Sequence, residues 1–115
     1  MLKKTTLAAA LAFAMQAPWS ATCQAGIIFD TGNEFLSMCG DPGLRITSYC
    51  GGATTGYFDM LQTMGETCAT GSYQTREQVA DIVLKFLRDH PEARNRSAAS
   101  QARAALIQAF PCPKN

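Results

Sequence analysis

The stretch that decides the fold runs from Thr75 to Pro91 and reads TREQVADIVLKFLRDHP. Thr75 and Gln78 form a capping-box pattern that predicts where a helix begins. Pro91 disfavours helical backbone at His90, so the helix is expected to end there. Apolar residues recur inside it at spacings of three and four, which predicts an amphipathic helix with a buried face made of Val79, Ile82, Val83, Phe86 and Leu87.

Similar patterns on both sides of this stretch predict three more helices. Thr31-Gly32-Asn33-Glu34 is a second capping box, and a short helix with Phe35, Leu36 and Cys39 on one side should follow it. Ser97 is a suitable N-cap for a last helix from Ala98 to Phe110. We therefore expect an all-α fold, a small four- to five-helix disulfide-linked bundle.

The remaining helix is expected to run from about Leu44 to Met64. Gly52 and Gly56 lie one turn apart in it, which predicts that another backbone approaches closely there. A glycine-rich phosphate loop is the alternative, but no Gly-Lys-Ser/Thr follows. The spacing predicts a buried face made of Ile46, Tyr49, Cys50, Ala53, Tyr57, Met60, Leu61 and Met64.

Length and composition exclude several classes of function. The 115 residues suit one domain, and a net charge of +1 gives no field to attract nucleic acid. One histidine and no Cys-x-x-Cys pattern argue against a metal site, and no cofactor is expected. Asp59 could be an isolated buried acid, although such a residue more often faces water. No catalytic residues are predicted, so we expect no enzyme.

The first 25 residues are predicted to be a signal peptide. Lys3 and Lys4 precede the apolar run Leu7–Met15, which is too short to span a bilayer. Small residues favour cleavage after Ala25, which would leave residues 26–115 as one domain in the periplasm with no membrane attachment. A rival interpretation makes Cys23 a lipidated residue, although the usual preceding leucine is missing.

Four of the five cysteines remain after such a cleavage, which suggests two disulfides in an oxidising compartment. Three pairings are possible. The spacing favours a local Cys39–Cys50 bridge, with Cys68–Cys112 tying the middle loop to the C-terminal end. A reactive thiol activated by His90, the only histidine, is the competing interpretation.

Several motifs, taken in order, resemble the Rap/Tai family of periplasmic immunity proteins. The most specific is the helix that ends in His90-Pro91-Glu92, followed by a terminal helix that ends in Phe110-Pro111-Cys112-Pro113. The other matching segments are Thr31–Leu36 with Cys39, Tyr49–Gly52 with Gly56, Cys68, Val79–Leu87, Ala98–Ala99 and Ala105–Cys112.

The resemblance implies a small helical fold with disulfides that is often dimeric. It also implies a protein that binds and inhibits a peptidoglycan amidase effector of type VI secretion. In the family, a loop between late helices enters the toxin's cleft, and the corresponding stretch here is His90–Ser97. Pro91 and Glu92 match the family's motif, whereas Arg94, Asn95 and Arg96 lie where members vary. The Ala53-Thr54-Thr55 segment departs from the bulkier apolar residues that are usual there.

Two other functions compete with the immunity hypothesis. A small periplasmic acid-stress chaperone would have a similar size and helix content, and it would suppress aggregation of unrelated proteins after unfolding near pH 3. An enzyme would depend on Asp59 or a free cysteine and would need a substrate cleft. For the His90–Ser97 segment itself, the alternative is a solvated connection between helices.

Overall fold

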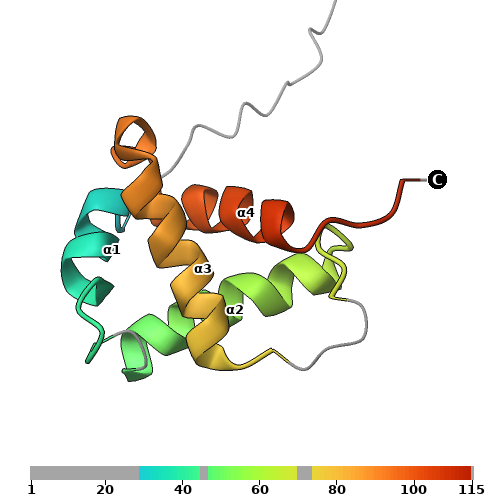
Figure 1. Cartoon of the computed structure of the whole chain (residues 1–115), viewed down its shortest axis with the longest axis horizontal. Coiled ribbons are helices and arrows are strands. Elements are labelled where there is room, and N and C mark those ends of the chain that lie inside the picture. Colours follow the sequence, from blue (N-terminus) through green and yellow to red (C-terminus); the bar gives the residue numbers. More distant parts are fainter. Residues whose placement is uncertain (1–28, 45–46, 70–73, 115) are drawn as a thin grey trace, which may run out of the picture.

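The computed structural model describes residues 29–44, 47–69 and 74–114, and within these ranges every regular element is helical (Figure 1). This confirms the all-α prediction. The elements are α1 (Gly32–Cys39), α2 (Ser48–Thr63), α3 (Arg76–Asp89), the short 3₁₀ helix η1 (Pro91–Ala93) and α4 (Ala98–Ala109).

Both predicted capping boxes are present. The Thr31 side chain accepts from the Glu34 amide at 3.2 Å, and the Glu34 carboxylate accepts from the Thr31 amide at 2.8 Å. Thr75 and Gln78 make the same pair of bonds at the start of α3. These bonds satisfy amides that have no partner inside the helix, so the local sequence determines where α1 and α3 begin.

The second helix is shorter at its start than the spacing predicts. It begins at Ser48, because the Thr47 side chain caps it, and Leu44 lies in the preceding turn. At its other end Gly65 adopts a φ of 71°, which favours glycine, and donates to the Gln62 carbonyl at 3.0 Å. The Glu66 amide reaches the Leu61 carbonyl at 2.9 Å, which completes a Schellman motif.

The predicted buried face of α2 was partly wrong. Tyr49, Met60 and Met64 are 49%, 59% and 61% exposed. Cys50 and Leu61 are buried as predicted, and α2 also buries Gly51, Thr54 and Phe58. Thr54 can occupy the core because its hydroxyl donates to the Cys50 carbonyl at 3.0 Å, which satisfies a buried polar group.

The close backbone approach predicted at Gly52 and Gly56 is also wrong. Both glycines are exposed, and a methyl group added at either would meet nothing within 4 Å. The close approach occurs at Gly32, in α1.

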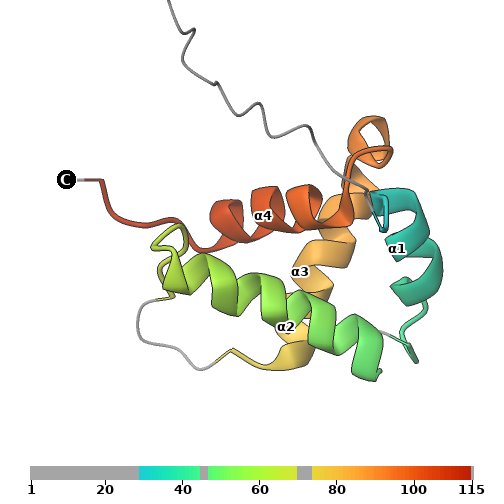
Figure 2. The same ribbon diagram turned by 180° about the vertical axis from the view of Figure 1, so that it is seen from behind.

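The central element is α3, which contacts α1, α2 and α4. Figures 1 and 2 show it crossing one side of the layer that α2 and α4 form, with α1 beside its C-terminal half. The largest fully buried side chains lie where these helices meet and include Phe35, Val83, Leu84, Leu87 and Leu106. Burial of such apolar surface is the main stabilising contribution to the fold.

The buried face of α3 also differs from the prediction. Val79, Val83 and Leu87 are buried as expected, and Ala80 and Leu84 join them. Ile82 and Phe86 are only half-buried. The buried face of α3 is therefore rotated toward Ala80 and Leu84, and the side chains of Ile82 and Phe86 lie at its edge.

Both disulfides have the favoured pairing. Cys39 and Cys50 are joined, with Cα atoms 5.7 Å apart, and so are Cys68 and Cys112, with Cα atoms 4.7 Å apart. All four described cysteines are therefore oxidised, which contradicts the reactive-thiol alternative.

Three sequence-based predictions lie outside the described residues: the signal peptide at residues 1–25, the lipidated Cys23 and the burial of Ile46. No helix in the described ranges has the length and apolar character needed to cross a membrane.

Candidate functional site

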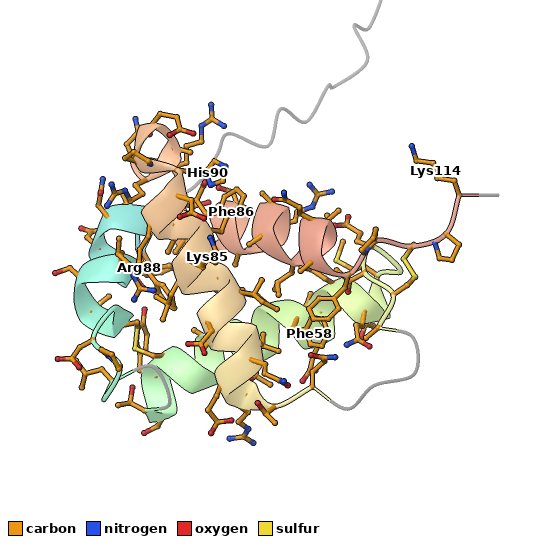
Figure 3. The ribbon with its side chains drawn as sticks, viewed as in Figure 1. Phe58, Lys85, Phe86, Arg88, His90 and Lys114 are labelled. Carbon is orange, nitrogen blue, oxygen red and sulfur yellow. A yellow bond between two sulfur atoms is a disulfide. The ribbon has the colours of Figure 1, made fainter. Side chains whose placement is uncertain are left out.

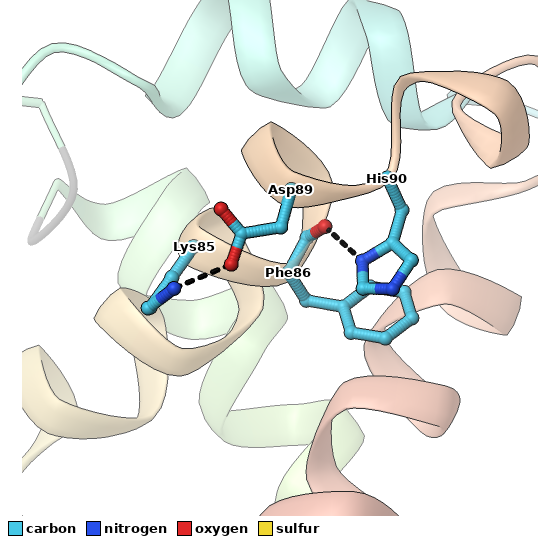
Figure 4. A network of polar contacts seen from close by, with 4 residues as sticks. All are labelled: Lys85, Phe86, Asp89 and His90. Carbon is cyan, nitrogen blue, oxygen red and sulfur yellow. Dashed lines mark hydrogen bonds and ion pairs between the residues drawn. The ribbon is translucent and has the colours of Figure 1, made fainter.

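The segment from His90 to Ser97 joins α3 to α4 and begins with a histidine fixed against its own helix. The His90 amide donates to the Phe86 carbonyl at 3.0 Å, and Nδ1 of His90 lies 2.9 Å from the same oxygen. The imidazole stacks on the Phe86 ring with centroids 4.0 Å apart, as Figure 4 shows. Pro91 follows directly, so the chain leaves the helix at a defined angle.

The segment is internally hydrogen-bonded. Residues Pro91–Ala93 form η1, in which the Ala93 amide donates to the His90 carbonyl at 3.1 Å. The Arg96 amide then donates to the Ala93 carbonyl at 3.1 Å, and Ser97 caps α4 by accepting from the Ser100 amide. We call residues His90–Ser97 the α3–α4 loop.

Backbone hydrogen bonds attach the α3–α4 loop to the start of α1. The Arg96 carbonyl accepts from the Gly32 amide at 2.9 Å, and the Arg94 carbonyl accepts from the Asn33 amide at 2.8 Å. These amides belong to the first turn of α1, where a helix has no internal acceptors, so the loop takes their place. A bridge between Thr31 and Ser97 extends the attachment.

Gly32 is the residue that permits this attachment. A Cβ atom there would lie 2.8 Å from Cδ2 of Leu87 and 3.1 Å from both the Cα and the carbonyl oxygen of Arg94. Leu87 is fully buried and the Arg94 contact is backbone, so neither has free room to move. This role of Gly32 was not predicted from the sequence, although a glycine inside a capping box, where a better helix former would fit, was a usable signal.

The far end of α1 is fixed as well. The Arg88 guanidinium on α3 donates to the Gly40 carbonyl at 2.8 Å, and the Cys39–Cys50 disulfide joins α1 to α2. Figure 3 shows Arg88 between α3 and α1. The helix α1, on which the α3–α4 loop rests, is thus held at both ends.

Asp30, just before α1, connects this end of the helix to α2 and α4. The Asp30 carbonyl accepts from the Ala98 amide at 2.8 Å, and its carboxylate accepts from the Tyr49 hydroxyl. That hydrogen bond is the main reason why the pKa of Tyr49 rises to about 12, with partial burial and the charge of Asp30 adding to it.

The side chains of the loop are arranged in two groups. Pro91, Glu92, Asn95 and Arg96 are exposed, whereas His90 and Arg94 are half-buried. The Nε atom of Arg94 is buried and has no hydrogen-bond partner in the described structure. No ion pair connects Glu92, Arg94 or Arg96 to another described residue.

All six residues predicted to bind a partner therefore lie in one hydrogen-bonded loop, but they are not equivalent. Glu92, Asn95 and Arg96 are directed to solvent and have no competing ion pair. Arg94 lies against α1, and its carbonyl accepts a hydrogen bond from the Asn33 amide of that helix. The His90 ring turns away onto Phe86.

The polar residues at the start of α1 and beside the loop are stabilised locally. The pKa of Glu34 is lowered by its hydrogen bond from the Thr31 amide. The pKa of Asp89 is lowered by its hydrogen bond from Lys85, one turn earlier on α3 (Figure 4). Neither shift suits a general acid or base near neutral pH, where a raised carboxyl pKa is required.

Across the described residues, no cluster of three or more histidine, cysteine or acidic side chains could hold a metal ion. Asp59, the candidate buried acid, is exposed on α2. The site with a defined geometry is therefore the α3–α4 loop, which presents exposed polar side chains.

These features define a class: a small disulfide-linked helical domain that holds a short charged loop in one conformation. A family model described as Rap1a immunity proteins matches residues 31–112, so the chain belongs to this family. This confirms the resemblance seen in the sequence. No curated protein and no solved structure matches the chain.

Membership of the family has three direct consequences. Proteins of this family provide immunity, they act by binding a partner toxin, and they are generally not enzymes. The two disulfides and the family are consistent with an exported protein. The matched segment contains both disulfides and the whole α3–α4 loop.

Proposed function

We propose that this chain is a periplasmic immunity protein that binds and inhibits a peptidoglycan amidase effector of type VI secretion. In this proposal it protects the cell from its own toxin or from that of a sibling cell. The observation that carries the proposal is the attachment of the α3–α4 loop to α1 by the Arg94 and Arg96 carbonyls. A loop that is already ordered loses little conformational entropy when it enters a cleft.

The inhibition would be steric. Glu92, Asn95 and Arg96 extend from the loop and would contact polar groups in the cleft of the amidase, while the loop backbone occupies the space that substrate needs. Arginine suits this role because its guanidinium presents several donors in a fixed geometry. The buried Nε of Arg94 leaves the rest of that guanidinium as a further candidate contact.

Export would proceed through the segment 1–25, with cleavage after Ala25 and oxidation of the four remaining cysteines in the periplasm. Intact-mass measurement of protein from the periplasmic fraction tests this directly. A measured mass equal to that of residues 26–115 minus four hydrogen atoms supports the proposal. Retention in the cytoplasm with reduced thiols, or a lipid on Cys23, contradicts it.

The loop is tested by an Arg96→Glu variant, measured for affinity to an exported amidase encoded beside this gene, which is the partner that the proposal expects. We expect a loss of about 30-fold or more, because charge reversal at a central arginine removes an attraction and adds a repulsion. Arg76→Glu is the matched control, since Arg76 is also exposed but lies at the opposite end of α3. Equal binding by both variants would exclude the loop as the contact.

Protection of cells is the second readout. Cells that express the exported amidase together with the parent protein should not lyse. Cells that express it together with the Arg96→Glu variant should lyse. If instead the protein leaves lysis unchanged and suppresses aggregation of unrelated proteins near pH 3, the acid-stress chaperone alternative is correct.

We also propose a homodimer, as the resemblance implies, built on the exposed face of α2. Tyr49, Met60 and Met64 leave apolar surface on this face, and Asp59 is the only charged residue in the helix. Two copies could therefore meet there with little charge repulsion, because each contributes only one carboxylate. Light scattering after size-exclusion chromatography tests the dimer, which Met60→Glu should dissociate.

A further inference from the structure

A groove of about 240 Å³ lies between α3 and α4, next to the α3–α4 loop. Its α3 wall includes Ile82, Phe86 and His90, which recur every four residues, and its α4 wall includes Ala105 and Ala109. The groove exists because small alanines stand opposite large side chains. Ile82 and Phe86, which the sequence pattern placed in the core, are half-buried here because nothing on α4 fills the space.

Two uncharged polar side chains line the groove, Gln108 and His90, and the imidazole of His90 has a fixed orientation. Nδ1 of His90 lies 2.9 Å from the Phe86 carbonyl, and a carbonyl can only accept, so Nδ1 carries the proton. In the neutral ring Nε2 is then an acceptor, and it has no hydrogen-bond partner among the residues that the structure describes. The stacked Phe86 ring fixes the plane of this imidazole (Figure 4).

The rim of the groove adds no unbalanced charge. Lys85 and Asp89 border it, and they pair with each other across one helical turn (Figure 4). A charged occupant would therefore lose hydration without gaining a counter-ion, which is costly. The surface suits a flat, uncharged side chain that carries one hydrogen-bond donor, a description that fits tyrosine and tryptophan.

We infer that this groove receives a tyrosine or tryptophan side chain of the bound toxin, beside the inserted loop. The inference rests on the proposed function, because it takes the partner to be a protein that already contacts the loop. His90 lines the groove and also begins the loop, so a protein seated on the loop covers both. Buried aromatic side chains of this kind supply much of the affinity of protein interfaces.

The first test fills the groove from within. Ala109→Leu places a larger side chain in it at an exposed position at the end of α4, where the core is not disturbed. Ala104→Leu is the matched control, because Ala104 is exposed on the same helix and does not line the groove. We expect Ala109→Leu to weaken amidase binding about tenfold or more and Ala104→Leu to leave it unchanged. Equal affinities overturn the inference while leaving the proposed function intact.

The second test needs no toxin. N-acetyl-tyrosinamide and N-acetyl-phenylalaninamide are titrated into the oxidised, exported protein while the methyl signals of Ile82 and Ala105 are followed by NMR. Saturable shifts are expected, with the tyrosine amide binding a few-fold more tightly because its hydroxyl donates to Nε2 of His90. These shifts should disappear in Ala109→Leu. An absence of saturable shifts, or equal binding of both amides, rejects the assigned occupant even if the amidase binds the loop.

Discussion

The two disulfides lie in contrasting regions of the molecule. Cys39 and Cys50 are 0% and 3% exposed and belong to the hydrophobic core beneath α1. Cys68 and Cys112 are only half-buried, and they connect the chain after α2 to the C-terminal segment. Beside the first bridge, α1 is fixed at both ends by hydrogen bonds from distant residues. Beside the second, the Cys68 amide donates to the Phe110 carbonyl at 3.0 Å.

The difference shows that a disulfide can stabilise in two ways. The buried bridge contributes packing as well as a restriction on the unfolded chain, because its sulfur atoms fill space between α1 and α2. The half-exposed bridge acts mainly as a tether on a terminal segment. The α3–α4 loop depends on α1, so the first bridge supports this loop and the second does not.

The largest expected effect follows from removing each bridge as a pair of alanines. The bridges span 11 and 44 residues, for which chain entropy alone gives about 3 and 4 kcal/mol. We expect the opposite order. Cys39→Ala with Cys50→Ala should lower the free energy of unfolding by about 4–5 kcal/mol, because buried volume is lost as well. Cys68→Ala with Cys112→Ala should cost about 2 kcal/mol, since the terminal segment can detach while the helices remain folded.

Urea unfolding of the two double variants measures this difference, and amidase binding supplies a second readout. The Cys68/Cys112 variant should bind as the parent does, because its bridge is remote from the α3–α4 loop. A larger loss of stability in that variant would mean that chain entropy outweighs burial. The contrast between the two regions would then be wrong.

Gly32→Ala should have the next largest effect. The added methyl group conflicts with Leu87 and with the Arg94 backbone, and overpacking of this kind costs about 1–3 kcal/mol. Because the contact lies between α1 and the loop, we also expect weaker amidase binding. Hydrogen exchange at the Gly32 and Asn33 positions reports on the loop attachment separately from global stability. Unchanged protection of these amides would show that the attachment tolerates the substitution.

The same substitution should have the opposite sign on α2. Gly52→Ala and Gly56→Ala place methyl groups in open space on the exposed side of α2, so each should stabilise the protein by about 0.5–1 kcal/mol. Thermal unfolding of both single variants and of the pair measures this gain. A destabilising effect of either substitution would contradict the open space found around these two glycines.

These glycines also mark what the sequence could predict. Helix starts were predictable because capping is local: Thr31 with Glu34, and Thr75 with Gln78, interact across three residues. The disulfide pairing followed from where the helices end. The burial of Thr54 instead of Met60, and the close contact at Gly32, depend on how the helices rotate against one another. That rotation is set by contacts between distant residues, such as Gly32 with Leu87, which periodicity within one helix does not encode.

The same limit applied to the site. The position of the α3–α4 loop between two helices could be predicted, because Pro91 and Ser97 are local signals. Its attachment to α1 could not, since it joins backbone groups more than sixty residues apart. The groove was also missed, because Ile82 and Phe86 fit the spacing of a core face and only the alanines opposite them leave them half-buried.

The smallest expected effect concerns the link between Tyr49 and Asp30, which can be switched by pH. The Tyr49 hydroxyl must keep its proton to donate, and its pKa is raised from 10 to about 12 in the folded protein. The stability that this bond contributes is therefore fully present below pH 10 and is lost as the pH rises through 12.

Tyr49→Phe should be less stable than the parent by at most about 1 kcal/mol at pH 7, because the half-exposed bond is screened by water. The difference between the two proteins should narrow between pH 10 and pH 12, as followed by urea unfolding at each pH. Tyr57, whose pKa is also raised, remains in both proteins. A difference in stability between the two proteins that stayed constant over this range would mean that the Tyr49 hydroxyl contributes nothing. Tyr49 would then stabilise the protein only through its ring contact with Phe35, with centroids 6.3 Å apart.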